Sequence, residues 1–93
     1  MLKILRSTRN GSVSLTVIGR IEGENLAELK RIIDSEVEDH NLVLDLKDLT
    51  LADQSAIQFL ALREEEGVVL ENCPPYIRDW IAAEKRRNRR RKP

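Results

Sequence analysis

Residues 41–62, NLVLDLKDLTLADQSAIQFLAL, decide the fold of this chain. The segment opens with an apolar run, residues 42–46, that is interrupted only by Asp45. It then crosses a polar link and enters an apolar helix that begins near Asp53. The nearly unbroken apolar character predicts a central parallel strand that is buried on both faces. A buried strand that leads into a helix through a tight acidic turn is a place where α/β folds hold ligands or modified side chains.

The residues before this segment predict a β-hairpin and a helix. Residues 2–5 are mostly apolar, and a second strand alternates apolar and polar residues through Val13, Leu15 and Val17. Asn10-Gly11 between them favours a tight turn, because both residues tolerate a positive φ angle. A helix capped by Asn25 follows. Its apolar face recurs at helical spacing and consists of Leu26, Leu29, Ile33 and Val37.

The residues after the opening segment predict one more strand and a last helix. The second helix extends from about Asp53 to Glu66 and ends at Gly67, which suits a left-handed helix terminus. Residues 68–70 form the fourth strand. Pro75 then fits the first turn of a third helix, whose apolar face is made of Tyr76, Ile77, Trp80 and Ile81.

The expected order is therefore β-β-α-β-α-β-α. This order predicts an α/β fold: a small mixed four-stranded sheet, with a hairpin followed by parallel βαβ units, packed with about three helices. The 93 residues make one domain, residues 1–84, followed by a basic tail, residues 85–93, that we expect to be disordered. No apolar stretch approaches the ~20 residues of a membrane span. The single cysteine fits a reducing cytoplasm, where we expect the chain to be located.

The net charge of zero hides a strong asymmetry along the chain. Residues 1–84 contain 9 basic and 16 acidic residues, a net charge of −7, and the tail has a charge of +7. The tail is a candidate for binding nucleic acid or anionic lipid without sequence specificity. The alternative is a disordered terminus that aids solubility or folds back on the acidic body. The basic residues concerned are Lys85, Arg86, Arg87, Arg89, Arg90, Arg91 and Lys92.

Several pieces of the sequence, in this order and spacing, resemble the STAS domain, named from sulfate transporters and anti-sigma factor antagonists. The resemblance covers residues 2–84. Its matching pieces are residues 17–21, the strand at 42–46, the link at 49–53 and the strand at 67–70, which read VIGRI, LVLDL, LTLAD and GVVL. The resemblance implies a non-catalytic module that binds a regulatory protein through the start of the second helix, here Asp53, Gln54, Ser55, Ala56 and Ile57.

The resemblance also implies a phosphorylation switch, from which this chain departs. Members with a switch carry Asp-Ser-(Ser/Thr)-Gly at this helix start, and a partner kinase phosphorylates the first serine. Here the motif reads Asp53-Gln54-Ser55-Ala56, so Gln54 occupies the acceptor position. Ser55 is an alternative acceptor near the positive end of the helix dipole, although Asp53 would repel the phosphate. In the simpler interpretation Asp53 caps the helix and Ser55 is an ordinary first-turn residue. A separate hypothesis is that Gln54 is a permanent polar contact that keeps the surface competent to bind without regulation.

The residues do not favour an enzyme. His40, the only histidine, falls at an element boundary, and Cys73 has no evident base near it. The spacing of Asp45, Asp48 and Asp53 matches no standard metal loop, and we expect neither a metal nor a cofactor. The expected partner is an anti-sigma factor or a related ATP-binding kinase. The alternative is that the chain is a cytoplasmic accessory subunit of a membrane transporter for lipid or anions, and binding through the tail comes third.

Overall fold

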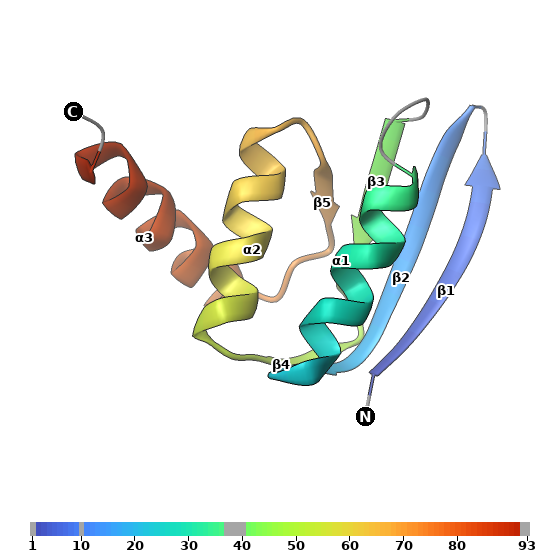
Figure 1. The fold of residues 1–93 in the computed structure, drawn as a ribbon, viewed down its shortest axis with the longest axis horizontal. Coiled ribbons are helices and arrows are strands. Elements are labelled where there is room, and N and C mark those ends of the chain that lie inside the picture. Colours follow the sequence, from blue (N-terminus) through green and yellow to red (C-terminus); the bar gives the residue numbers. More distant parts are fainter. Residues whose placement is uncertain (1, 10, 37–40, 92–93) are drawn as a thin grey trace.

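The computed structural model describes residues 2–9, 11–36 and 41–91, with the side chains of residues 9 and 89–91 left aside. Five strands and three helices occupy these residues (Figure 1). In chain order they are β1 (Leu2–Arg9), β2 (Ser12–Ile21), α1 (Glu24–Glu36), β3 (Asn41–Asp45), β4 (Leu49–Ala52), α2 (Gln54–Glu65), β5 (Val69–Glu71) and α3 (Pro75–Arg91). Val37, predicted for the first helix, and His40 lie outside the described residues.

The strands form one mixed sheet in the order β1-β2-β3-β5, with β4 also paired to β2. β1 pairs along its whole length with residues 12–19 of β2, as an antiparallel hairpin. β3 and β4 are parallel to β2, and β5 is parallel to β3. The predicted α/β fold, a hairpin followed by parallel units with three helices, is confirmed.

The number of strands differs from the prediction, because residues 49–52 form a fifth strand instead of a link. β2 is ten residues long, and β3 pairs only with its first half, Ser12 to Thr16. β4 pairs with β2 further along, from Gly19 to Ile21, and the register shifts between Gly19 and Arg20. Strand β4 therefore forms because β3 leaves part of the β2 edge unpaired.

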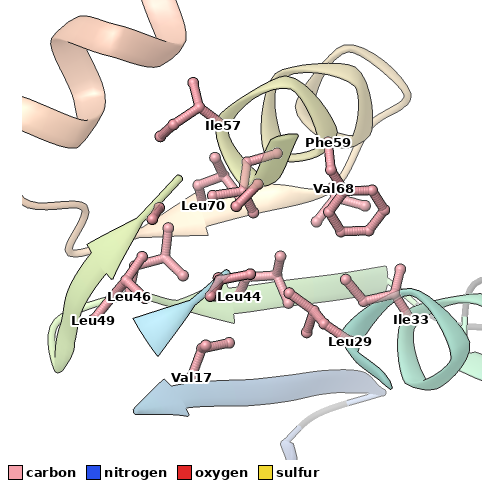
Figure 2. Packing of buried hydrophobic residues seen from close by; sticks show 14 of the residues in the cluster. Val17, Leu29, Ile33, Leu44, Leu46, Leu49, Ile57, Phe59, Val68 and Leu70 are labelled. Carbon is pink, nitrogen blue, oxygen red and sulfur yellow. The ribbon is translucent and has the colours of Figure 1, made fainter. Parts of the chain in front are cut away.

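A single hydrophobic core lies between the sheet and the helices. Leu29 of α1, Leu44 of β3 and Phe59 of α2 point into it (Figure 2). α1 and α2 cover one face of the sheet, and α3 packs on the outer side of α2 (Figure 1). The opposite sheet face is an open groove of about 470 Å³, lined by Ser7, Ser12, Ser14, Thr16, Val43, Asp45 and Glu71. The predicted burial of the third strand on both faces is therefore wrong, since Val43 is only half-buried.

α3 extends past Glu84 to Arg91, into the tail for which the sequence predicts disorder. The first part of α3 is anchored by Ile77 and Ile81, which are fully buried. Lysine and arginine are good helix formers, so nothing in the sequence ends the helix at Glu84. No helix of the described residues is long and apolar enough to cross a membrane.

Candidate functional site

Asp53 lies at the start of α2, as the N-cap that the sequence predicts. Its Oδ1 accepts a hydrogen bond from the backbone N–H of Ala56 (2.9 Å), and its Oδ2 accepts one from the N–H of Gly23 (3.0 Å). Its own N–H donates to the carbonyl oxygen of Ile21 (3.1 Å). Both carboxylate oxygens are therefore engaged in joining the start of α2 to the turn between β2 and α1.

The other four residues predicted for partner binding differ in their exposure to solvent. Gln54 and Ser55 are exposed, whereas the side chains of Ala56 and Ile57 are fully buried. Ile57 lies on the side of α2 toward α3 (Figure 2). Only Gln54 and Ser55 can therefore offer their side chains to a partner at the start of this helix.

The exposed side of α2 extends beyond its first turn. Gln58 and Leu62 are exposed one and two turns after Gln54, and the side chain of Leu62 is 51% exposed. We call Gln54, Ser55, Gln58 and Leu62 the α2 stripe. The i, i+4 spacing of residues 54, 58 and 62 is a signal that could have found it. It was hidden because residues 56–62 read as apolar nearly all round.

α3 carries two exposed aromatic residues. Tyr76 is 52% exposed and Trp80 is 38% exposed. The hydroxyl of Tyr76 donates to the carbonyl oxygen of Thr50 in β4 (2.7 Å). Further along the two helices, a pocket of about 160 Å³ is lined by Gln58, Leu62, Glu84, Arg87 and Asn88. We call this hollow the α2–α3 groove.

Two glutamates hold charge at the contact between α2 and α3. Glu64 accepts hydrogen bonds from Arg78 on both oxygens (3.1 Å each) and from Lys85. Burial alone would raise the pKa of Glu64, but the bonds from Lys85 and Arg78 outweigh burial and hold the pKa below its ordinary value of 4.5. Glu84 is only 3% exposed and accepts a bond from Arg87 (3.1 Å).

The predicted anion-binding residues are not all equally available. Lys85 and Arg87 pair with Glu64 and Glu84, and Arg86 is exposed. The side chains of Arg89, Arg90 and Arg91, and Lys92 as a whole, lie outside the described residues. Part of the charge of the tail therefore stabilises the packing of α3 on α2.

Cys73 and Asp45, which the sequence offers as candidates for catalysis or metal binding, have contacts of the kind that structural residues make. Burial raises the pKa of the Cys73 thiol above 9.0; Arg78 lowers it and Glu64 raises it further. The thiol is therefore protonated near neutral pH. Asp45 accepts bonds from the Lys47 N–H and the Asn72 side chain, as a turn residue does. Within the described ranges, no group of three or more His, Cys, Asp or Glu residues could hold a metal ion.

Neither a scan against protein-family models nor a search of curated proteins finds a match for this chain. The comparisons therefore add no family to the geometry described above. The interpretation of the α2 stripe depends on its exposure, its chemistry and the resemblance of the sequence.

Proposed function

We propose that this protein is a STAS-like, non-catalytic interaction module that docks a regulatory protein through the α2 stripe. The observation behind the proposal is that α2 buries five apolar residues and leaves the α2 stripe exposed from the helix start; the buried residues are Ala56, Ile57, Phe59, Leu60 and Ala61. The stripe combines three short or neutral polar side chains with one large apolar residue, Leu62. Such a mixture is typical of a docking surface that exists both free and bound.

The expected partner is an ATP-binding regulatory kinase of the anti-sigma factor type, and the expected location is the cytoplasm. Gln54 stands at the position where switched members of the STAS family carry a phosphorylated serine. Its amide is exposed and accepts no phosphate. The proposed module is consequently always competent to bind. Detection of phosphate on Ser55 after incubation with the partner kinase would contradict this part of the proposal.

The test measures binding to a purified ATP-binding kinase of the anti-sigma factor type, by isothermal titration calorimetry. Gln58→Arg places a bulky charge in the centre of the stripe and should weaken binding about tenfold or more. Ala27→Arg adds the same charge on the exposed side of α1 and should leave affinity unchanged. Equal affinity for both variants would place the contact elsewhere. Gln54→Glu should also weaken binding, because it adds the negative charge that a phosphate would bring.

Genome neighbours distinguish this function from the alternative of a transporter accessory subunit. A kinase or sigma-factor gene beside the chain's own gene favours a regulatory partner, whereas transporter genes favour the accessory role. In the second case the same calorimetric series, with the transporter's cytoplasmic subunit as partner, tests the same α2 stripe.

A further inference from the structure

α3 exposes two aromatic side chains one helical turn apart. Tyr76 and Trp80 are both exposed, and their i, i+4 spacing puts them on the same side of the helix. Neither residue lines the α2–α3 groove. The bond from the Tyr76 hydroxyl to Thr50 fixes one of the two rings on the body of the protein. The two rings therefore form a solvent-facing pair that is separate from the α2 stripe.

The same side of α3 continues into the basic end of the chain. Ala83 and Arg87 follow Trp80 at helical spacings of three and four residues, and the helical backbone continues to Arg91, one turn after Arg87. We call positions 76, 80, 83, 87 and 91 the α3 stripe. At about 1.5 Å per residue the stripe is about 22 Å long. It begins with the two aromatic residues and ends among arginines.

The end of α3 stays positive after its ion pairs are counted. Residues 85–92 contain seven basic residues and no acidic residue, and two of the basic side chains pair with Glu64 and Glu84. Seven positive charges and these two negative ones give a net charge of +5. The bond from Arg87 to Glu84 uses one of several N–H groups, and the Arg87 side chain remains 53% exposed. α3 also lies on the outer side of α2, away from the sheet (Figure 1). A ligand with several negative charges therefore fits this end of the helix.

The aromatic residues distinguish between the polyanions that this charge attracts. An anionic membrane binds a helix through a broad apolar face. α3 buries its own aliphatic residues, Ile77 and Ile81, in the core, and among its described side chains no leucine, isoleucine, valine or methionine is exposed. Single-stranded nucleic acid instead combines phosphates with flat bases that stack on aromatic side chains. The bases of a duplex are already stacked on one another, so the α3 stripe favours a single strand.

We propose that the α3 stripe binds single-stranded nucleic acid without sequence specificity. Bases stack on Tyr76 and Trp80, and the neighbouring phosphates meet Arg87, the exposed Arg86 beside it and the basic residues that follow. The sequence offers only the charge of the tail for such binding. The helix adds two stacking residues in line with that charge. The site uses no residue of the α2 stripe, so this second function does not depend on the proposed docking of a regulatory protein.

Titration of the full-length protein with oligo(U) of about ten nucleotides at low salt tests the proposal. Trp80 is the only tryptophan, and a base that stacks on its ring quenches its fluorescence. We expect saturable quenching and a slope of log K against log salt of about −3.5, as for about five neutralised phosphates. Oligo(dT) should bind with similar affinity, because the proposed contacts are to bases and phosphates. Absence of binding, or binding that leaves Trp80 unquenched, would overturn the proposal.

Variants of Trp80 separate stacking from a general apolar contact. Fluorescence anisotropy of a labelled oligonucleotide measures their affinity, since these variants lack tryptophan. Trp80→Leu keeps an apolar side chain without a ring and should weaken binding about fivefold or more, whereas Trp80→Phe keeps a ring and should lose less. Urea denaturation checks that both variants are folded. Equal affinities of the two folded variants would overturn the role of stacking.

Glutamine replacements locate the phosphate contact. One variant changes Arg86 and the arginines at 89–91, which leaves the pairs of Lys85 and Arg87 intact and keeps good helix formers in α3. It should weaken binding about tenfold or more at low salt and reduce the salt slope. The matched variant removes four exposed charges elsewhere and should bind as the wild type does; it changes Lys3, Arg20, Arg31 and Lys47. Equal loss in both variants would overturn the assignment to α3.

Competition tests the choice of nucleic acid among polyanions. The competitors are vesicles of anionic phospholipid, which add an apolar interior, and poly-glutamate, which offers carboxylates without flat bases. At equal concentration of negative charge, we expect unlabelled oligo(U) to displace the labelled oligonucleotide much better than either competitor does. Displacement by vesicles or by poly-glutamate that equals displacement by oligo(U) would overturn the choice of single-stranded nucleic acid.

Discussion

At the scale of single residues, Asp53 shows how one side chain can serve two elements. Its two carboxylate oxygens accept bonds from the first turn of α2 and from Gly23, thirty residues earlier in the chain. Gly23 has a φ angle of +51°, a conformation that favours glycine and that the bond to Asp53 helps to hold. The residue that looks like part of a binding motif is thus the residue that fixes where α2 begins.

Replacing Asp53 by alanine should destabilise the protein by about 1–3 kcal/mol, because the N–H groups of Ala56 and Gly23 lose their acceptors. Urea denaturation of the two proteins measures the difference. Asp53→Asn is the matched control, since it keeps one acceptor and should lose less. A midpoint for the alanine variant equal to that of the wild type would show that these bonds add nothing to the free energy of unfolding.

The residues near Asp53 also show what sequence reasoning captures at this scale. The cap follows from residue type and position, and the structure confirms it. The burial of Ala56 and Ile57 does not follow, because residues 56–62 are apolar nearly all round and give no clear face. Only the packing of α3 on α2 determines which side is covered. The exposed Gln58 and Leu62 are missed for the same reason.

At the scale of elements, Glu64 links α2 to α3. It receives Arg78 and Lys85 from opposite ends of the buried part of α3. These partners keep its pKa below 4.5 despite burial. Folded Glu64 therefore binds its proton less tightly than the unfolded chain does, and the stability it contributes is present above pH 4.5 and lost as the pH falls through the lowered pKa.

Acidification below pH 4.5 should consequently destabilise the wild type more steeply than Glu64→Gln, which has no carboxylate to protonate. Thermal unfolding measured at intervals of pH from neutral to acid gives the two curves. Glu65→Gln, at the exposed neighbouring position, is the control and should follow the wild-type curve. Parallel curves for the wild type and Glu64→Gln would contradict the assigned coupling between α2 and α3.

Two elements differ from the prediction for reasons that local sequence does not contain. β4 has only four residues, with buried ends and an exposed middle, so it lacks the alternation that identifies a strand. It exists because β2 is longer than β3. α3 extends past Glu84 because its buried first turns supply the helix nucleus. Lys85 then forms a salt bridge with Glu64. Both outcomes depend on contacts between distant parts of the chain.

At the scale of the whole molecule, α3 brings basic residues of the tail (85–93) into contact with acidic residues of the rest of the chain. The tail is a continuation of a helix packed against the acidic body, and two of its basic residues pair with glutamates. The sequence shows the charge asymmetry, but only the fold shows that the tail begins inside the domain. α3 therefore crosses the boundary that the sequence predicts at Glu84.

A chain that ends at Glu84 should lose the helical signal of residues 85–91 and part of its stability, because the contact between Lys85 and Glu64 disappears. Far-UV circular dichroism and urea denaturation measure the two losses. Full-length Lys85→Gln separates them, since it should lose stability and keep its helix. In the full chain, Cα chemical shifts of residues 85–91 at random-coil values would contradict a helical tail.

The shared edge of β2 has a consequence for synthesis on the ribosome. β2 pairs with β1, β3 and β4, yet it ends at Ile21, and its last partner ends at Ala52. Until both α1 and α2 have been made, up to residue 65, the apolar side of β2, with Val13, Leu15 and Val17, is not fully covered. This side of the nascent hairpin is therefore exposed to water or to a chaperone during synthesis. The other side carries the polar residues Ser12, Ser14 and Thr16, so the aggregation-prone surface is limited to one face.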